Sequence, residues 1–481
     1  MNTTVSSCKE ALEAAGLKTT HYPGTSEYDA RTQSYFSTSA QLAPACYVQP
    51  TSSEEVALAV TTLEQKTSCN WAIRSGGHTV WPGASNIDDG VTIDLGLMNK
   101  TTYVPESKTA QIQAGSRWQQ VYETLGAYGV TVPGGRTSTV GVGGFLTGGG
   151  NTFYTGRRGL GCDNVVNFEV VLATGEIVHA NANENPDLFK ALKGGSANFG
   201  IVTRFDMAVV ESNTLWGGLV TYPSSTTDQH IAAYVNWTNN IENYQDGSAI
   251  LFWSHTPASR DITVTAAYHD TTAAVAAPAF DEFLAVPHQL TNSLRVGTHL
   301  DMTNELILTG GYRNVWFAIT FKNDPRLYRK ALDLQSEFIS SWLPLAPSGD
   351  FIHHAIFQSI PTLLARHAAA RGGNVLGLDR GHDHDNAVMF QVQFAFRGGP
   401  DTEAEARRRM VAYRQDLKRH SAALGAAVDW EYLSYADCTQ DPLRSYGAEN
   451  VAFIRRVAAR YDPRGVFQSR MPGGFKISKV V

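Results

Sequence analysis

Two glycine-rich segments constrain the fold of this chain more than any other feature of its sequence. The first is Arg-Ser-Gly-Gly-His at residues 74–78, and the second runs from Gly134 to Gly150 with 8 glycines in 17 positions. Glycine tolerates positive φ and lets the main chain approach a ligand closely, so such segments present backbone N–H donors to phosphate groups. The first segment adds an arginine charge and one histidine. Together the two segments predict a cradle for a nucleotide cofactor.

The cradle does not follow the common nucleotide-binding motifs. The run Gly141-Val142-Gly143-Gly144 lacks the final glycine of the GxGxxG motif, and the GxxxxGK[ST] motif does not occur in the chain. These two motifs mark the Rossmann fold and the P-loop NTPases. The sequence therefore indicates a different nucleotide-binding fold.

Length, charge and hydrophobicity narrow the class of protein. The 481 residues are 43% hydrophobic, which suffices for two domains with their own cores. The net charge of −6 gives no basic field, so we expect no nucleic-acid partner. The chain has no run of about 20 apolar residues, and its first residues lack the apolar core of a signal peptide. We expect a soluble enzyme with no membrane partner, whose signal peptide is absent from this chain.

The five cysteines show no CxxC or other metal-type spacing, so we expect no metal site. Cys8 opens a short N-terminal helix and Cys69 directly precedes a strand that leads into the first glycine segment. We therefore expect these two cysteines to form a disulfide. That bond would indicate an oxidising compartment and a secreted glycoprotein, with N-x-S/T acceptor sites at Asn2, Asn99 and Asn236.

Strand and helix patterns divide the chain into two domains and a returning tail. An α+β domain spans residues 1–210 and contains both glycine segments. Residues 211–430 form a second α+β domain with an antiparallel sheet, and residues 431–481 return to the first domain. The patterns predict strands at 71–73, 91–95, 109–114, 165–172, 177–180, 199–205, 250–253, 262–265 and 388–396, and helices from 53 and at 118–125, 186–192, 328–342 and 403–424.

Two histidine-containing segments receive simple interpretations. His353-His354 begins an apolar run, which predicts a position at the domain surface or the edge of the core. The segment His382-Asp383-His384-Asp385 carries ligand-type side chains, but it lies among glycine and aspartate residues between predicted elements. Such a composition favours a solvated loop over a metal site.

Further motifs follow the glycine segments in a fixed order, and as a set they point to a known family. The chain resembles the berberine-bridge-enzyme-like flavoproteins of fungal type, within the vanillyl-alcohol-oxidase superfamily, over roughly residues 45–205 and 430–475. The resemblance implies a two-domain fold whose FAD-binding domain is of the PCMH type. The motifs are Arg74–His78, Thr139–Gly144, Gly148–Gly150, Gly159–Val165, Asn198–Thr203, Tyr446-Gly447-x-x-Asn450 and Tyr461-Asp462-Pro463.

The resemblance implies an extended FAD with its diphosphate on residues 74–78 and a covalent bond from His78 to the 8α carbon of the isoalloxazine. A neutral imidazole is a nucleophile, as this bond requires. Many relatives carry a second bond through a cysteine at the position of Thr137, so a single link is expected here. The residues implied to bind FAD are Arg74, Ser75, Gly76, Gly77, His78, Gly83, Thr139, Val140, Gly141, Gly143, Gly144, Gly150, Asn151, Gly200, Ile201, Val202, Tyr446 and Asn450.

Three positions bear on the electron acceptor and the substrate. Val140 matches the family position that controls oxygen access to the flavin, where a small residue implies an oxidase. Val80 and Asn151 stand where relatives often carry tyrosine, so phenol groups that activate alcohols in some relatives are missing. These changes argue against a plant monolignol or typical sugar substrate, and Trp81 suggests an apolar or aromatic wall.

Oxidation of a substrate carbon by a flavin needs a base that takes a proton. In the predicted strand 388–396, Gln391 and Gln393 point to one face, and a second group of candidates is Tyr432 and Tyr435. The resemblance assigns Tyr435 to the wall of the active site. Because the unperturbed pKa of tyrosine is about 10, a phenol acting as base near neutrality needs a nearby positive charge or the reacting hydroxyl itself.

The sequence therefore predicts an oxidase that transfers hydride from a secondary-metabolite or carbohydrate alcohol to covalently bound FAD and then to molecular oxygen, giving H2O2. Two other functions stay open. One is a flavin-containing cyclase of a biosynthetic pathway that shapes an intermediate without net oxidation. The other is a non-enzymatic protein that only holds the flavin.

Overall fold

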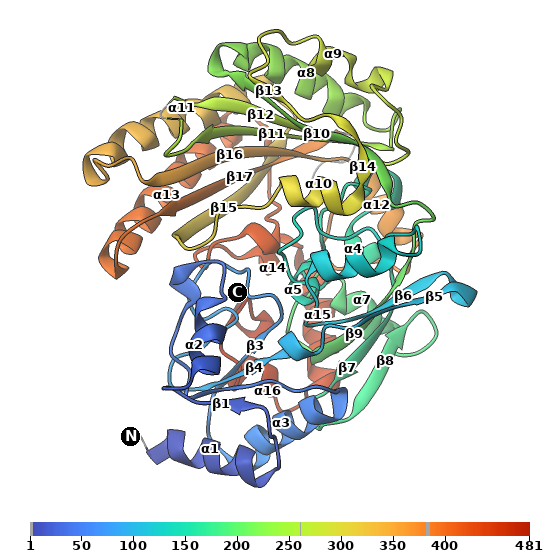
Figure 1. Cartoon of the computed structure of the whole chain (residues 1–481), viewed down its shortest axis with the longest axis vertical. Helices are drawn as coiled ribbons and strands as arrows, with labels where there is room; N and C mark the ends of the chain where they lie inside the picture. Colours follow the sequence, from blue (N-terminus) through green and yellow to red (C-terminus); the bar gives the residue numbers. More distant parts are fainter. Residues whose placement is uncertain (1–2, 260, 381–384) are drawn as a thin grey trace.

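The structure is a computed structural model that describes residues 3–259, 261–380 and 385–481. The described residues form three β-sheets, which lie in two halves of the molecule, together with the helices around them. A four-stranded and a five-stranded sheet lie in the lower half of Figure 1, and a nine-stranded sheet lies in the upper half. The expected α+β class with an antiparallel second sheet is confirmed.

The four-stranded sheet carries the first glycine segment at the end of one strand. Its order is β1-β2-β4-β3, and β4 pairs in parallel with both β2 and β3. Helix α3 (Ser53–Lys66) connects β2 to β3; its N-cap Ser52 accepts a hydrogen bond from the Glu55 N–H, and its apolar face joins the core beneath the sheet. The strands are β1 (Thr20–His21), β2 (Cys46–Val48), β3 (Trp71–Arg74) and β4 (Val91–Asp94).

The five-stranded sheet is antiparallel, with the order β5-β6-β9-β7-β8. Its hairpin β7–β8 turns at Gly175, whose φ of +84° suits glycine. The strands are β5 (Thr101–Val104), β6 (Thr109–Gln113), β7 (Val165–Val171), β8 (Ile177–Asn181) and β9 (Ile201–Ala208). Helices of this half are α1 (Thr3–Ala14), α2 (Ser26–Gln33), α4 (Trp118–Gly126), α5 (Val142–Thr147), α6 (Thr155–Arg158) and α7 (Pro186–Leu192).

The nine-stranded sheet is antiparallel and follows the order β13-β10-β12-β11-β16-β17-β15-β18, with β14 also paired to β10. Its two central strands β16 and β17 are buried nearly throughout. The strands are β10 (Thr214–Pro223), β11 (Gly247–His255), β12 (Thr263–Asp270), β13 (Thr291–Asn292), β14 (Arg295–Thr298), β15 (Arg313–Lys322), β16 (Phe351–Ile360), β17 (Ala387–Phe396) and β18 (Ala427–Val428).

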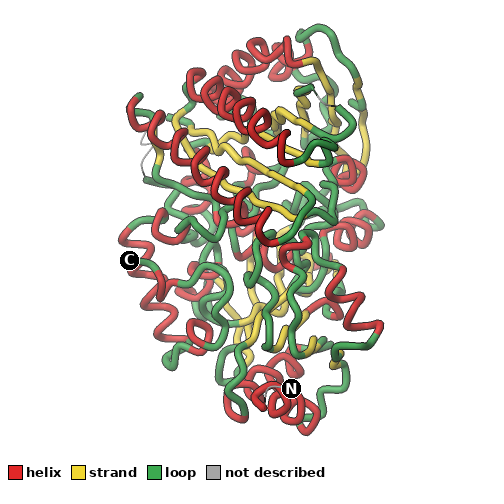
Figure 2. Tube along the Cα trace, turned by 90° about the vertical axis from the view of Figure 1, so that its left-hand side faces the viewer, coloured by secondary structure: helices red, strands yellow, loops and turns green. Residues whose placement is uncertain are grey.

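Helices cover one face of this sheet and leave its other face toward the lower half (Figures 1 and 2). Phe390, Val392 and Phe394 of β17 share one core with four of these helices, and the alternation of the strand turns Gln391 and Gln393 to the opposite face. The helices of this half are α8 (Thr227–Asn240), α9 (Asp281–Leu284), α10 (His299–Glu305), α11 (Pro325–Trp342), α12 (Leu363–Ala369) and α13 (Pro400–Ala423).

After β18 the chain runs back into the lower half, where its last helices lie among the first strands (Figure 1). These helices are α14 (Pro442–Ser445), α15 (Ala448–Tyr461) and α16 (Val466–Ser469), and their apolar side chains share one core with β3 and β4. Residues Leu364 and Val375–Leu378 also join this core, although the sequence places them in the middle domain. Short 3-10 helices lie at Thr38–Ala40, Leu95–Leu97, Pro105–Ser107, Gly161–Asn164, Ser224–Thr226, Pro278–Phe280, Leu343–Leu345, Leu433–Tyr435 and Ile477–Lys479.

Two local expectations have clear outcomes. Cys8 and Cys69 form the expected disulfide, with Cα atoms 6.4 Å apart, and it ties α1 to the start of β3. The expectation for His353 is wrong: the side chain lies on the buried face of β16, next to Phe338 and Tyr413, because the whole strand is internal. The segment His382–His384 lies outside the described residues.

Candidate functional site

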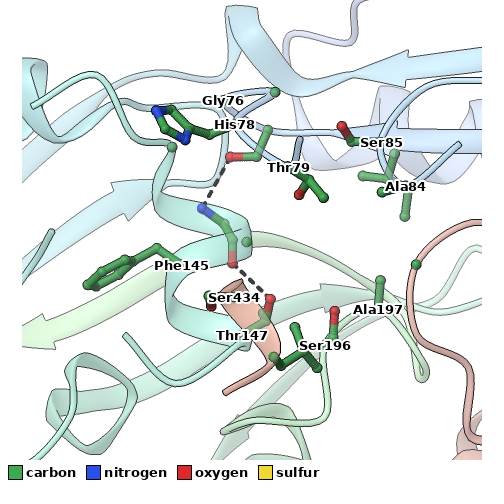
Figure 3. A pocket seen from close by; sticks show the side chains of 18 of the residues that line it. Gly76, His78, Thr79, Ala84, Ser85, Phe145, Thr147, Ser196, Ala197 and Ser434 are labelled. Carbon is green, nitrogen blue, oxygen red and sulfur yellow. Dashed lines mark hydrogen bonds between the residues drawn. The ribbon is translucent and has the colours of Figure 1, made fainter. Parts of the chain in front are cut away.

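A cavity of about 290 Å³ lies where three parts of the chain meet. Its wall combines both glycine segments, strands β15 and β17 of the nine-stranded sheet, and the C-terminal residues 471–476. Figure 3 shows His78 and Phe145 on one side of this cavity and Ser196 and Ala197 on another. The two loops that the sequence assigns to a cofactor therefore belong to a single cavity.

The two glycine segments touch each other through their backbones. A Cβ on Gly76 would lie 2.5 Å from the Cα of Gly141, and a Cβ on Gly141 would lie 2.3 Å from the backbone nitrogen of Gly76. Ser75 holds the same crossing, because its Oγ donates to the carbonyl of Ala114 (2.6 Å) and accepts from the N–H of Gly143 (3.1 Å; dashed in Figure 3). Close packing of the loops thus requires glycine at 76 and 141.

Arg74 lies behind the first glycine segment and is not among the described residues that line the cavity. Its guanidinium is fully buried and donates to the carbonyl of Arg31 and to Ser34 Oγ, both at 2.7 Å. It also lies 3.4 Å from an Asp94 oxygen and 3.8 Å above the ring of Tyr35. The Asp94 carboxylate is shared with Arg31, and these contacts place the guanidinium where it holds the loop from behind.

The imidazole of His78 sits on the cavity wall between aromatic rings. Its ring stacks on Phe36 with centroids 4.2 Å apart, and the ring of Trp316 is 6.3 Å away. The Nε2 atom is buried without a hydrogen-bond partner among the described residues. Burial, with the charge of Arg117 as the second cause, lowers the pKa of His78 from 6.5 to about 3. The ring is therefore neutral near pH 7, with one unpaired nitrogen.

Apolar side chains line the cavity beyond His78. Val80 and Trp81 pack with Trp316 in one cluster, and Phe475 from the C-terminal segment lies against Trp81 with ring centroids 5.5 Å apart. Val140 also lines the cavity. This arrangement matches the apolar and aromatic wall expected at Trp81.

Thr137 lines the cavity at the position where many relatives carry a linking cysteine. Its Oγ1 donates a hydrogen bond to the carbonyl of Leu306 at 3.1 Å. Within the described parts of the chain, no cysteine lines this cavity. A second covalent bond through sulfur therefore has no residue to form it at this wall.

A chain of polar side chains leads from the cavity into the interface between the halves. Tyr435 lines the cavity, and its hydroxyl accepts a hydrogen bond from Arg136 Nη2 at 3.4 Å. The same nitrogen donates to Gln358 Oε1, which also accepts from Asn151 Nδ2 (3.2 Å). Gln358 in turn donates to Gln391 Oε1 (3.4 Å). Sequence reasoning missed Arg136, although it lies inside the second glycine segment.

Two of the four expected catalytic side chains reach the cavity. Tyr435 and Gln393 line it. Gln391 points to the same face of β17, but it is buried in the network one step behind the wall. The hydroxyl of Tyr432 accepts from the backbone N–H groups of Gly150 (2.8 Å) and Asn151 (3.1 Å), and burial raises its pKa. Tyr432 therefore anchors the second glycine segment and does not face the cavity.

The expected cofactor residues also separate into a lining set and a supporting set. Those that line the cavity are Ser75, Gly76, Gly77, His78, Val140, Gly141, Gly143, Gly144, Gly200, Ile201 and Val202. Tyr446 donates to the carbonyl of Gly194 (3.2 Å), and Asn450 donates to the carbonyl of Tyr446 (3.1 Å), so both brace the loops from behind. Backbone hydrogen bonds of Gly150, Asn151 and Thr139 hold neighbouring segments in the same way, and the carbonyl of Gly83 lies against Gly473.

Lys476 is the second functional side chain that sequence reasoning missed. It is 3% exposed, lines the cavity and donates to the carbonyl of Ala197 at 3.1 Å. Burial lowers its pKa from 10.5 to about 7, and repulsion from Lys479 acts in the same direction. The sequence Gly-Gly-Phe-Lys at 473–476 could have pointed to this lysine, because the first glycine segment also combines two glycines with a nearby basic residue.

Two kinds of feature are absent from the residues that the structure describes. Among residues 3–259, 261–380 and 385–481, no group of three or more His, Cys, Asp and Glu side chains is arranged to hold a metal ion. In the same ranges, no helix has both the length and the apolar character needed to span a bilayer.

The fold is that of the berberine-bridge-enzyme-like flavoproteins. A family model described as an FAD binding domain matches residues 44–181. The structure resembles xylooligosaccharide oxidase from Myceliophthora thermophila (TM-score 0.77, 20% identity, 98% of this chain and 99% of the other) and 6-hydroxy-D-nicotine oxidase from Arthrobacter nicotinovorans (TM-score 0.75, 19% identity, 93% and 96%). Berberine bridge enzyme itself superposes with a TM-score of 0.73 at 16% identity, over 96% of this chain and 99% of the other.

Curated relatives extend over the whole chain. The FAD-dependent monooxygenase sdcF of Emericella nidulans is 42% identical over 98% of each chain, and drtC of Aspergillus calidoustus, of the same description, is 38% identical over 99% of this chain and 91% of that protein. This chain therefore belongs to the family of FAD-dependent oxidoreductases that contains these fungal enzymes.

The cavity fits FAD on three structural grounds. The glycine crossing at 76 and 141 leaves no room for side chains where the two loops line the cavity. His78 offers an unpaired, neutral ring nitrogen, and Ser434 Oγ is buried without a partner among the described residues. Lys476 brings a positive charge to the same wall. Phosphate, flavin and carbonyl acceptors of FAD match such donors.

Proposed function

We propose that this protein is an FAD-linked oxidase that removes a hydride and a proton from a small organic donor, with FAD attached through His78 alone and O2 as the electron acceptor. When bound, FAD would accept the hydride and pass two electrons to oxygen, giving H2O2. The observation that carries the proposal is the neutral His78, with its unpaired ring nitrogen, on the wall of a glycine-lined cavity.

The surroundings of His78 support a covalent link. A protonated imidazole cannot act as a nucleophile, and burial keeps this ring neutral down to about pH 3. Stacking on Phe36 fixes the plane of the ring, so little orientational freedom is lost when a bond forms. Thr137 supports a single link, because it replaces the second attachment point with a hydroxyl that is already bonded to a carbonyl.

Tyr435 and Arg136 are the groups that we assign to proton removal. Tyr435 lines the cavity, and as a phenolate its oxygen would take the proton from the donor O–H and become a neutral phenol. Arg136 is 9% exposed and forms no ion pair with a carboxylate in the described part of the chain. Its uncompensated charge next to the Tyr435 oxygen would stabilise the negative form of this base. Gln393 on the same wall can orient the donor by hydrogen bonding.

The wall favours an apolar or aromatic donor. One apolar cluster lies beside the ring of His78 and contains Trp81, Trp316, Val80 and Leu308. A polyhydroxylated sugar would leave many hydroxyl groups facing these side chains, which costs free energy without hydrogen-bond partners. We therefore place a secondary-metabolite alcohol ahead of a carbohydrate as the donor.

The descriptions of the curated relatives favour a second candidate function. The fungal relatives at 42% and 38% identity are both described as monooxygenases, which transfer one oxygen atom to the substrate. Oxidase and monooxygenase use the same cavity and the same cofactor, and they differ in the fate of oxygen. The flavin-containing cyclase differs from both, because it forms its product without reducing the flavin.

The test begins with the cofactor and then follows oxygen. The purified protein is precipitated with acid: we expect the yellow colour to remain with the protein, and a tryptic peptide containing His78 to carry the mass of FAD. The variant His78→Ala should lose this adduct, while His288→Ala, at an exposed histidine, should keep it. A colourless precipitate from the unmodified protein would contradict the link.

Anaerobic mixing with a panel of aromatic and aliphatic alcohols then separates the candidate functions. Bleaching of the flavin absorbance, followed by one H2O2 per turnover in air, supports the oxidase. Label from 18O2 in the organic product indicates the monooxygenase. Product formed with an unbleached flavin indicates the cyclase. No bleaching and no product with any donor would leave a protein that only holds the flavin.

We also propose an oxidising compartment for this protein. The Cys8–Cys69 disulfide supports it, because such bonds persist where thiols are not kept reduced. Asn99 and Asn236 are exposed and would accept glycans there. Loss of mass from the native secreted protein on glycosidase treatment is the expected result, and a protein found only inside cells with two free thiols at Cys8 and Cys69 would contradict it.

A further inference from the structure

The cavity needs a positive charge that the first glycine segment does not supply. FAD carries two negative charges on its diphosphate, and the sequence assigns Arg74 to them. The structure instead commits the Arg74 guanidinium to Asp94, Tyr35 and Ser34 behind the loop. Backbone N–H groups can bind the phosphate oxygens, but they bring only partial charge.

Lys476 is the sole lysine or arginine among the described residues that line the cavity, and no aspartate or glutamate lines it. Its amino group therefore lies buried without a carboxylate partner on that wall, and an anion in the cavity would stabilise its charged form. An ammonium has three donors, and one of them is used by the carbonyl of Ala197. Burying an unpaired charge is costly, so the arrangement favours the arrival of an anion from the cavity.

The backbone around Lys476 is held in place independently of its charge. Asn198, fully buried next to the loop at 196–200, donates from Nδ2 to the carbonyl of Phe475 (3.0 Å) and accepts at Oδ1 from the N–H of Ile477 (3.0 Å). Gln468 donates to Asn198 in addition. One asparagine thus clamps both neighbours of Lys476 and aims its side chain at the wall that Ser196, Ala197 and Gly200 share.

We propose that Lys476 is the cationic partner of the FAD diphosphate, supplied by the C-terminal segment in place of the arginine of the glycine loop. This inference rests on the proposed FAD function of the same cavity. Each part of the cavity wall then has a separate role in binding FAD. The glycine loops supply shape and backbone donors, His78 supplies the attachment point, and the last residues of the chain supply the charge.

The experiment uses the full chain with His78→Ala, so that flavins bind reversibly and affinities can be measured. In this background, Lys476→Met is compared with Lys476→Arg and with Lys18→Met, at an exposed lysine near the N-terminus. The ligands are FAD, ADP and riboflavin, measured by calorimetry or by flavin fluorescence. ADP contains the diphosphate without the flavin ring, and riboflavin contains the ring without phosphate.

We expect Lys476→Met to weaken FAD and ADP binding about 10- to 100-fold, as for loss of a charge-assisted hydrogen bond, and to leave riboflavin binding unchanged. Lys476→Arg should recover most of the loss, and Lys18→Met should change none of the three affinities. Unchanged ADP affinity in Lys476→Met would overturn the proposal. An equal loss for riboflavin would also overturn it, because the lysine would then act on the ring or on the fold.

Thermal unfolding of the flavin-free proteins separates a ligand contact from a structural role. Replacing a buried unpaired ammonium by methionine should leave the Tm of the flavin-free chain equal or higher, while the gain in Tm on adding ADP should shrink. A lower Tm without ligand would assign Lys476 to the fold and overturn the proposal. If the His78→Ala background does not fold, the unmodified chain expressed without riboflavin takes its place, because ADP needs no bond to His78.

Failure of this inference is distinguishable from failure of the proposed function. If the His78→Ala chain with Lys476 intact binds no FAD, the FAD function itself fails. If that chain binds FAD and Lys476→Met binds it equally well, only the role of the lysine fails.

Discussion

At the scale of single residues, three basic side chains at or behind the cavity wall differ in how their charges are paired. Arg74 lies behind the wall, stacks on Tyr35 and shares the Asp94 carboxylate with Arg31, so its role is structural. Arg136 and Lys476 are both at least nine-tenths buried and have no carboxylate within ion-pair distance in the described part of the chain. Because such charges are costly in a fold, their positions beside Tyr435 and the cavity are what the site requires.

A prediction at this scale concerns Arg136 and Tyr435. With any donor that bleaches the flavin, Tyr435→Phe should slow anaerobic flavin reduction about 10²- to 10⁴-fold, as for loss of a general base. Arg136→Met should slow it to a similar degree, and Arg136→Lys, which keeps the charge, should slow it less. The rates are measured by stopped-flow absorbance at saturating donor.

The double variant is the control for a shared role. If the two side chains act as one unit, Tyr435→Phe with Arg136→Met should be little slower than either single variant. Fully multiplicative losses would assign them independent roles. Circular dichroism and flavin content of each variant check that the fold and the cofactor are intact.

At the scale of elements, the crossing of the two glycine segments positions the site. Strand β3 delivers residues 74–78, and the loop before α5 lies across them at Gly141. This crossing is not visible in the pattern of either segment alone. A strand, a hairpin and a helix such as β3, β7–β8 and α7 follow from local periodicity, and the sequence predicts all three close to their bounds. The contact between distant loops depends on sheet order, which local periodicity does not contain.

A prediction at this scale compares two glycines of the second segment. In Gly141→Ala, the new Cβ would lie 2.3 Å from a backbone nitrogen, so no side-chain movement can relieve the contact. We expect a loss of about 1–3 kcal/mol or more in the free energy of unfolding, together with reduced flavin content. In Gly144→Ala, which lies in α5 with nothing within 4 Å of the new Cβ, we expect no loss and a gain of up to about 1 kcal/mol. Denaturant unfolding and flavin absorbance measure both, and equal effects at the two positions would contradict the crossing.

At the scale of the whole molecule, the interface between the halves is rich in buried neutral histidines. His269 and His299 lie there against Phe153, and His353 lies in the core of the nine-stranded sheet. Burial lowers the pKa of each of them from 6.5 to about 3. Between about pH 3 and pH 6.5 these histidines are therefore uncharged in the folded chain and charged in the unfolded chain.

Stability should therefore depend on pH in a defined window. The unfolded chain takes up protons on these histidines below about pH 6.5, while the folded chain does not until about pH 3. Between these pH values the unfolded state therefore binds more protons than the folded state. The free energy of unfolding falls as pH is lowered through this range. Each histidine contributes up to about 1.4 kcal/mol per pH unit.

Denaturant midpoints between pH 7 and pH 5 measure this dependence before most carboxylates titrate. His269→Gln should flatten the slope, and the exposed His288→Gln should leave it unchanged. Stability that is constant or rises as pH falls from 7 to 5 would contradict the prediction.

The sequence by itself determined the class of fold, the cofactor-binding domain, the disulfide and the loop that carries His78, because these depend on local motifs and on spacing along the chain. Only the tertiary structure decided which side chains face the cavity. It moved Arg74, Tyr432, Tyr446 and Asn450 behind the wall, where backbone carbonyls and N–H groups of distant loops need partners. It brought Arg136 and Lys476 to the site from distant parts of the sequence. The physical reason is that burial and charge balance are set by contacts between segments far apart in sequence, and local patterns do not record those contacts.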